Sequence, residues 1–257
     1  MSVLAQLVEA LGSGAVRVVD LTAPLSSGTP TLQLPEQFGQ TAKFQLEEIS
    51  AYDDRGPAWY WNNFRTGEHT GTHFDAPNHW VTGQGGEDVS SVPAARLVAP
   101  AAVVDVSERV VEDPDLLLEV EDIKAWESEH GPLPAGGWLL VRTGWDARSH
   151  SQEDYLNADE AGPHTPGLSV ACARWVAEAS PVIGLGVETV GTDAGGAAGF
   201  DPMFPCHTLM HGAGKYGLTQ LQNLAELPPT GGVIVAGPLR IVGGSGSPTR
   251  VLALVER

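Results

Sequence analysis

The chain has 257 residues, 42% of them hydrophobic and 18% charged, which is close to the composition of an ordinary globular protein. Acidic residues outnumber basic ones by 32 to 14, and the resulting formal charge of −18 repels nucleic-acid phosphates and anionic lipid headgroups. No apolar run approaches the roughly 20 residues that a membrane-spanning helix needs. We therefore expect a soluble protein with no nucleic-acid partner and no membrane partner.

The N-terminal segment and the cysteines bear on the compartment. Residues 1–11 are apolar but include Glu9, lack a basic start and precede no small-residue cleavage pattern, so no export signal is expected. The two cysteines, Cys172 and Cys206, are too few for a disulfide framework and lack the spacing of a metal knuckle. Together these features predict a cytoplasmic protein.

The first predicted element is a short amphipathic helix over 3–11, where apolar residues recur every three or four positions before a glycine stop. Its apolar face is expected to pack against another surface. A short strand is predicted over 17–21 and is followed by a proline-rich, irregular segment. A strand with a slip over 44–49 and an aromatic-rich strand over 59–64 come next.

The rest of the chain alternates strand and helix patterns. In order, they predict a strand over 101–106, a helix over 120–130, a strand over 138–142, a helix over 169–179, a strand over 182–187 and closing strands over 233–236 and 251–255. Ser169 is the expected N-cap of the second helix, and the glycine-rich stretches 191–199 and 243–246 are expected to be loops. Without a repeat or a linker, this predicts one α/β domain with a mixed sheet over residues 1–257.

Three of the eight histidines lie in the segment 69–79, together with an aspartate. His69, His73 and Asp75 offer ligands that Zn²⁺, Mn²⁺ or Fe²⁺ accept, and three protein ligands leave coordination positions open. On a helix the two histidines share a face but Asp75 points away from it. On a straight strand the histidines lie about 13 Å apart, too far for metal bonds of roughly 2.1 Å.

The backbone must therefore curl between the ligands. Gly71 supplies the conformational freedom for this curl, and Pro77 fixes the turn before His79. A bent loop leaving a strand is the expected structure. The alternative, scattered polar loop residues, would suit a lone His-x-x-x-His pair, because such pairs arise by accident. The additional Asp75 and His79 favour a metal site.

Segment 69–79 resembles, position by position, the His-x-Gly-Thr-His-x-Asp-x-Pro-x-His signature of the cyclase family, which includes bacterial kynurenine formamidases and isatin hydrolases. Further similarity to the isatin-hydrolase branch, which hydrolyses a cyclic amide, is found in the segments 142–145, 162–167, 188–195 and 243–248. The resemblance implies a swivelling β/β/α-type fold and a homo-oligomer, a dimer or higher. It also implies a divalent ion held by His69, His73 and Asp75, with manganese as the ion of that branch and zinc as the alternative.

The resemblance is incomplete at a second metal position. In the formamidase branch the aspartate bridges to a second zinc, which also binds a downstream histidine and a glutamate. Here the matching stretch contains His207 and His211 but runs on to Thr219 and Gln220 with no glutamate. A neutral side chain is a weaker ligand for a hard dication. We therefore expect one ion per chain, with His207 or His211 turned to a small-molecule substrate.

Residues and resemblance together predict a metal-dependent amidohydrolase acting on C–N bonds in cyclic amides, of the isatin-to-isatinate type. Attack by a metal-bound water is expected, with His79 as general acid and base because its ordinary pKa lies near the operating pH. The alternatives for His79 are a fourth ligand of the metal or a residue that contacts one of the ligands. Alternative functions are hydrolysis of N-formylkynurenine or a related lactone or amide, and non-catalytic, metal-dependent binding of a carboxylate.

The predicted substrate contacts are the histidines His207 and His211 and the tryptophans Trp59, Trp61 and Trp80. Flat aromatic rings suit a planar bicyclic substrate, whereas core packing is the alternative for the tryptophans. For the two histidines the alternative is a hydrogen-bonded pair at the start of a helix.

Overall fold

The computed structural model describes residues 1–257. The helices are α1 (Val3–Ser13), α2 (Ser107–Glu112), α3 (Val120–His130), α4 (Gln152–Leu156) and α5 (Val170–Glu178). The strands are β1 (Val16–Asp20), β2 (Gln45–Ala51), β3 (Tyr60–Arg65), β4 (His73–Asp75), β5 (Val98–Asp105), β6 (Leu117–Leu118), β7 (Trp138–Arg142), β8 (Ala158–Asp159), β9 (Gly162–Pro163), β10 (Gly167–Leu168), β11 (Gly184–Val187), β12 (Tyr216–Thr219), β13 (Gly232–Pro238) and β14 (Gly246–Glu256).

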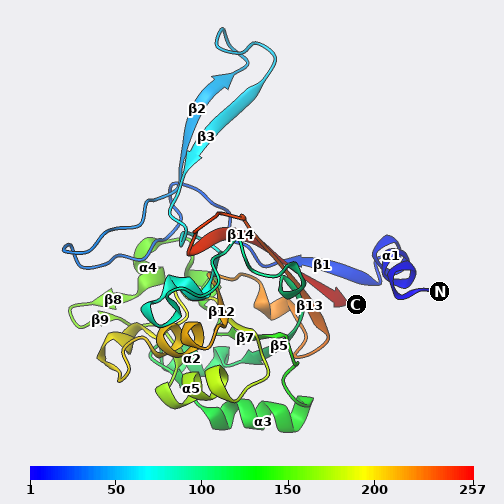
Figure 1. Ribbon diagram of the computed structural model, residues 1–257, viewed down its shortest axis with the longest axis vertical. Helices are drawn as coiled ribbons and strands as arrows, with labels where there is room; N and C mark the ends of the chain where they lie inside the picture. The colour runs from blue at the N-terminus through cyan, green and yellow to red at the C-terminus, as the bar shows by residue number, and fades with distance from the viewer.

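An eight-stranded mixed sheet forms the centre of the molecule, in the order β1-β14-β13-β5-β7-β11-β12-β4 (Figure 1). Strands β5, β7, β11 and β12 run parallel, because helical segments connect them, and the remaining pairings are antiparallel. The short strand β4 pairs with β12 on one side and with the start of β14 on the other. Seven strands therefore close into a ring, from which β1 extends along β14.

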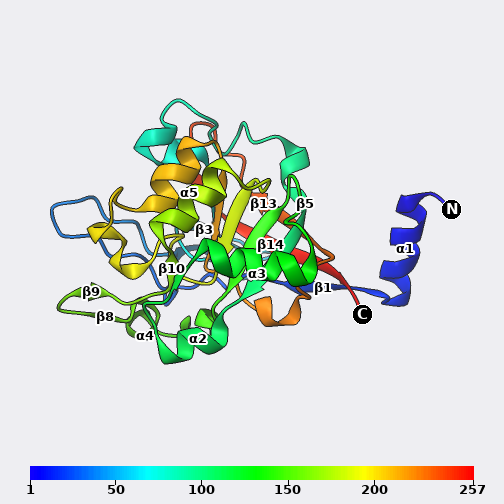
Figure 2. The ribbon, with the colours of Figure 1, turned by 90° about the horizontal axis from the view of Figure 1, so that it is seen from below.

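Apolar side chains pack on both faces of this closed sheet. Trp138 and Leu140 of β7 belong to one buried cluster, whereas Leu139 and Val141 between them belong to the other. This alternation is the period of two that a strand covered on both faces requires. The cluster containing Leu139 also includes buried residues of α3 and α5, which cover the outer face of the sheet (Figure 2).

The two predicted helices over 120–130 and 169–179 are confirmed as α3 and α5. Ser169 is the N-cap of α5, as predicted, since its side chain accepts a hydrogen bond from the amide of Cys172. A capping box between Glu119 and Asp122 starts α3. Both cysteines are buried free thiols.

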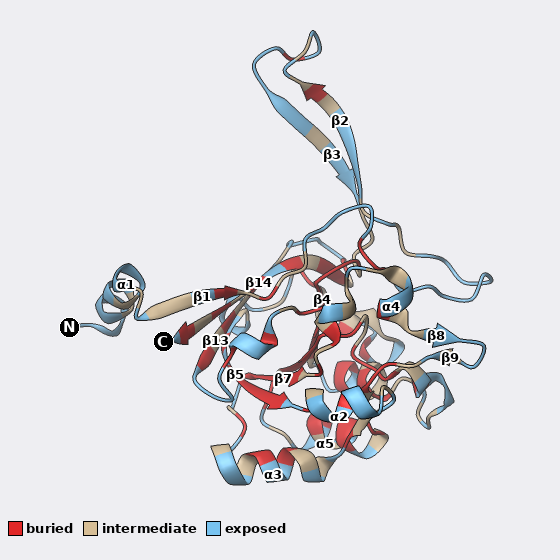
Figure 3. Cartoon of the chain, turned by 180° about the vertical axis from the view of Figure 1, so that it is seen from behind, coloured by how far each residue is buried: buried red, intermediate tan, exposed pale blue.

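Two arms extend from the closed sheet, the hairpin of β2 and β3 and the N-terminal helix α1 (Figure 3). The predicted slip in the first hairpin strand is confirmed as a register shift between Glu48 and Ser50. The predicted helix is confirmed as α1, and none of its residues is buried within one chain, so the surface on which it packs stays a prediction. The stretch 195–199 forms a 3₁₀ helix rather than a loop, and residue 246 already belongs to β14.

None of the helices has both the length and the apolar character needed to cross a lipid bilayer.

His164 joins the β8–β9 hairpin to the loop after α2. Its Nδ1 lies 2.6 Å from a carboxylate oxygen of Asp115, and its Nε2 lies 3.2 Å from one of Asp159. The hydrogen bonds to these carboxylates, that to Asp115 foremost, raise the pKa of His164 above its ordinary value of 6.5. A raised folded-state pKa means that the stabilisation is complete below the unfolded pKa and is lost as the pH rises through the folded one.

We therefore expect the wild-type protein to lose more stability than His164→Asn as the pH rises from below 6.5 through neutrality. Urea unfolding at a series of pH values measures the difference. The matched control is His150→Asn, which removes an exposed histidine elsewhere. Parallel pH curves for the wild type and His164→Asn would contradict the expectation.

Candidate metal centre

The histidine-rich segment curls as its sequence requires. A turn ends at Thr72, β4 follows, and Pro77 begins a one-turn 3₁₀ helix that ends at His79. Gly71 has φ +67°, and a side chain there would approach Leu25 to 2.5 Å. The bend at Gly71 is thus confirmed, but the strand lies within the motif rather than before it.

Strand β4 places Asp75 where the sheet closes. Asp75 pairs with Gly217 of β12 on one side and with Gly246 of β14 on the other. A Cβ atom at Gly217 would lie 2.7 Å from an oxygen of the Asp75 carboxylate, so the absence of a side chain makes room for that group. The carboxylate is buried and is the point on which the surrounding histidines converge.

Asp75 stands between the predicted ligands. One oxygen of its carboxylate lies 2.7 Å from Nδ1 of His69 and 3.3 Å from Nε2 of His73. Burial would raise the pKa of Asp75, but the charge of His73 and the hydrogen bond from His69 outweigh it and hold that pKa well below its usual range. Asp75 is therefore ionised, as a metal-binding carboxylate must be.

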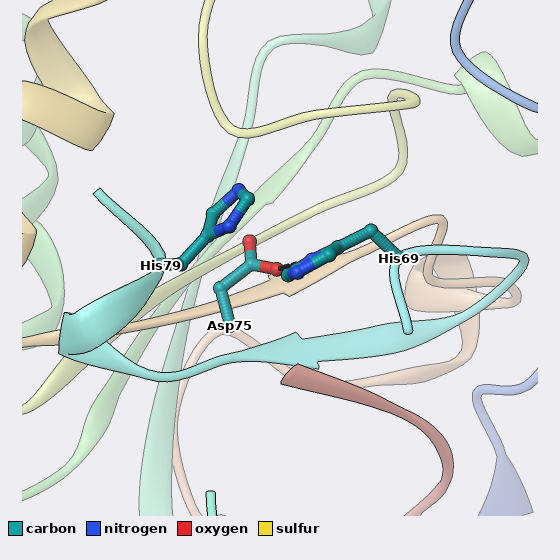
Figure 4. A group of neighbouring side chains, drawn as sticks. All are labelled: His69, Asp75 and His79. Carbon is teal, nitrogen blue, oxygen red and sulfur yellow. Dashed lines mark hydrogen bonds and ion pairs between the residues drawn. The ribbon is translucent and has the colours of Figure 1, made fainter. Parts of the chain in front are cut away.

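His79 completes one candidate group with His69 and Asp75, whose ligand atoms all lie within 4.8 Å of one another (Figure 4). The rings of His69 and His79 stack with their centres 3.8 Å apart. Burial lowers the pKa of His79 to about 3, and the neighbouring histidines contribute in the same direction. His79 is thus a neutral imidazole, and its pKa lies below the value near the operating pH that the sequence led us to expect.

A second candidate group contains the same carboxylate. His207 and His211 lie on a π-helical segment, Cys206–His211, and their ligand atoms come within 4.8 Å of each other and of Asp75. Their ring centres lie 5.4 and 5.9 Å from that of His79. The structure therefore brings together all five histidines of the predicted site.

Two of these histidines hold a proton on Nδ1 against a backbone carbonyl group and turn Nε2 to the centre. Nδ1 of His73 and of His211 lie 2.7 and 3.0 Å from backbone carbonyl oxygens, which only accept, so both Nδ1 atoms carry protons. Nε2 of His211 is buried and has no hydrogen-bond partner. Nε2 of His73 lies 3.3 Å from the Asp75 carboxylate and 3.0 Å from the Thr219 hydroxyl, so a cation bound there would replace the proton between His73 and Asp75. This donor set fits a divalent metal ion.

His207 differs in its protonation. Its Nδ1 lies 2.5 Å from a carboxylate oxygen of Asp193, which also accepts hydrogen bonds from the amides of Cys206 and His207. Burial alone would lower the pKa of His207, but the hydrogen bond and the charge of Asp193 outweigh burial and raise it. Burial and the neighbouring His207 instead lower the pKa of His211 to about 4. The centre thus combines a proton donor with neutral acceptors.

The predicted aromatic contacts divide into two groups. Trp80 packs beside His207, with ring centres 4.8 Å apart, and its indole N–H donates to Thr208. Trp59 and Trp61 lie at the β2–β3 hairpin and are about half exposed. Within one chain the structure does not bring these two residues to the histidines.

The histidine motif does not predict Asp193 or Thr219. The hydroxyl of Thr219 lies 2.9 Å from Nδ1 of His73, because β12 places it opposite that residue. The only sequence signal for Asp193 is its position in a glycine-rich loop, and Thr219 has only its place near the missing glutamate. Both act through contacts between residues far apart in the chain.

A closed mixed sheet with helices on its outer face and a buried carboxylate among histidines defines a metal-dependent α/β protein. The chain belongs to the cyclase family, since the family model described as putative cyclase matches residues 19–194. It is 46% identical to isatin hydrolase of Roseibium aggregatum over 259 aligned residues, which cover 100% of this chain and 98% of that protein. The predicted family is therefore confirmed.

Solved structures agree with this assignment. Isatin hydrolase A from Ralstonia solanacearum is 53% identical, with a TM-score of 0.97 over 100% of this chain and 98% of that one. An isatin hydrolase bound to the product analogue thioisatinate is 44% identical, with a TM-score of 0.97 over 100% of both chains. These likenesses confirm the predicted fold class.

Asp75→Asn removes the charge on which the candidate ligands converge, so we expect the variant to lose most of its affinity for divalent ions. For the wild type, metal at about 100 times its Kd should add about 2.7 kcal/mol to the free energy of unfolding. Thermal unfolding with and without Mn²⁺ or Zn²⁺ measures this gain. The matched control, Asp54→Asn, changes an exposed hairpin aspartate and should keep it. An undiminished gain in Asp75→Asn would exclude Asp75 as a ligand.

Proposed function

We propose that the protein is a hydrolase that cleaves the C–N bond of a cyclic amide and converts isatin to isatinate. The observation that carries this proposal is the full-length similarity to isatin hydrolases, one of them bound to the product analogue thioisatinate. The substrate is accordingly a small molecule, and residues 1–257 act as one hydrolase domain.

We propose that His69, His73 and Asp75 hold one divalent ion per chain, Mn²⁺ in preference to Zn²⁺. When bound, such an ion polarises a carbonyl group and lowers the pKa of water, which supplies a nucleophile at neutral pH. Thr219 supports a single ion, because its neutral hydroxyl, an acceptor for the Nδ1–H of His73, gives a second ion no carboxylate. His207 and His211 are then available to the substrate.

Two histidines near this ion have separate roles in proton transfer and hydrogen bonding. His79 is neutral, so it takes a proton from the attacking water and returns it to the leaving nitrogen. His207, held protonated by Asp193, donates a hydrogen bond to the carbonyl oxygen as negative charge develops there. His211 contacts the substrate beside it, and the Trp80 ring next to His207 offers a flat face to a planar substrate.

We propose a homo-oligomer, a dimer or higher, because both arms of the chain expose apolar surface. Val3, Leu4 and Val8 of α1 are each at least 70% exposed, and Trp59 and Trp61 are exposed at the hairpin. Contiguous apolar surface of this kind marks protein interfaces. A substrate role for Trp59 and Trp61 then requires the site of a partner chain.

The two buried free thiols support a cytoplasmic location, because free cysteines are typical of a reducing compartment.

Purified protein with Mn²⁺ should convert isatin to isatinate, and His79→Ala should retain the metal but lose turnover by about 10²- to 10⁴-fold. Absorbance of isatin measures turnover, and elemental analysis measures the metal in both proteins. The control is His150→Ala, a change at an exposed histidine far from the centre, which should keep full activity.

The same assay separates the alternatives. Turnover of N-formylkynurenine but not of isatin, with two zinc ions per chain, would replace the proposal with a formamidase. A His79→Ala variant that keeps turnover would exclude His79 as the proton carrier. Loss of metal together with turnover would make it a ligand.

Sedimentation velocity tests the oligomer directly. At micromolar concentration we expect a species of at least twice the 27.0 kDa chain mass. The reason is that association with another chain would cover the exposed apolar faces of α1 and the hairpin. A single species at the chain mass would contradict the proposal.

A further inference from the structure

A chain of hydrogen bonds lies behind His69, on the side of its ring away from Asp75. Nε2 of His69 is 2.8 Å from the hydroxyl oxygen of Ser245. That hydroxyl donates to a carboxylate oxygen of Glu68 at 2.6 Å, and the backbone amide of Ser245 donates to the same oxygen at 3.0 Å. Glu68 and His69 are neighbours in the chain, whereas Ser245 lies 176 positions after His69.

The chemistry of these groups sets the direction of the hydrogen bonds. The Glu68 carboxylate only accepts, so the single hydroxyl proton of Ser245 points to it. The Ser245 oxygen then accepts from His69, whose proton therefore lies on Nε2. Nδ1 of His69, 2.7 Å from the nearer Asp75 oxygen, is then the nitrogen on which a bound ion replaces the proton shared with that carboxylate.

The glycines on either side of Ser245 shape this contact. A Cβ atom at Gly246 would lie 2.6 Å from the His69 ring and 2.5 Å from the carbonyl oxygen of Phe74. A Cβ atom at Gly244 would lie 3.0 Å from the carboxylate of Glu68. The glycine-rich stretch predicted as a plain loop thus brings its backbone against His69 and Glu68, which side chains at these positions would prevent.

We propose that Glu68 and Ser245 are positioning residues of the metal centre. They hold the His69 ring in one orientation and one tautomer, so that Nδ1 is presented to the ion. Outer partners of this kind typically contribute 10- to 100-fold to metal affinity. The inference rests on the proposed role of His69 as a ligand, and it concerns metal retention rather than the identity of the substrate.

The test measures the Kd for Mn²⁺ by competition with a fluorescent chelator, without substrate. We expect Ser245→Ala to weaken binding by about 10- to 100-fold. The matched control is Ser247→Ala, because Ser247 lies two positions further along the chain, in β14, and its hydroxyl bonds only to backbone groups at Leu239 and Pro248. Equal affinities in Ser245→Ala and Ser247→Ala would overturn the proposal.

A second variant tests whether the two residues act in series. Glu68→Ala changes a half-buried side chain, so it provides a measurement even if Ser245→Ala fails to fold. We expect it to weaken Mn²⁺ binding too, and the double variant to be no weaker than Ser245→Ala alone, because both changes break one chain. The proposal would be overturned if the two changes weakened Mn²⁺ binding independently, so that their effects multiplied in the double variant. It would also be overturned if Glu68→Ala had no effect on Mn²⁺ binding.

These outcomes are separable from those of the proposed activity. If the wild-type protein binds Mn²⁺ but does not hydrolyse isatin, the proposed substrate is wrong. The positioning proposal is then still tested by the Mn²⁺ affinities of the variants. Wild-type protein that binds no Mn²⁺ removes both.

Discussion

The buried negative charge of Asp75 is the constraint on which the rest of the centre depends. A carboxylate in a nearly dry interior is costly unless opposite charge or hydrogen bonds surround it. His69 and His73 approach one of its oxygens, and His207 and His211 lie within reach of the same group. The glycine opposite it on each neighbouring strand leaves the space that this crowding needs.

The outer partners of the histidines give them different protonation states. Carbonyl oxygens hold the protons of His73 and His211 on Nδ1, whereas Asp193 raises the pKa of His207. His79 has no such partner and is neutral because it is buried. Chemically similar side chains thus differ in their tendency to hold a proton, which is what the proposed division of ligand, proton acceptor and proton donor needs.

Much of this could be predicted where the information is local. The bend at Gly71 followed from ligand spacing, and α3, α5 and the central strands followed from apolar periodicity. The contacts of Ser245 could not be predicted in the same way, because the pairing of β4 with β14 brings distant segments together. Those of Asp193 depend on the π-helical segment Cys206–His211, which apolar periodicity does not predict. The packing partner of α1 could not be predicted either, since an amphipathic pattern shows which face of a helix is apolar but not which surface covers it.

The place of β4 in the sheet also has a consequence for biosynthesis. This strand is hydrogen-bonded on one edge to β14, which begins at residue 246 of 257. A nascent chain therefore carries its histidine motif, without the strand that backs it, through the synthesis of the residues between β4 and β14. The histidines and Asp75 can reach their final arrangement only after β14 has been made and has paired with β4.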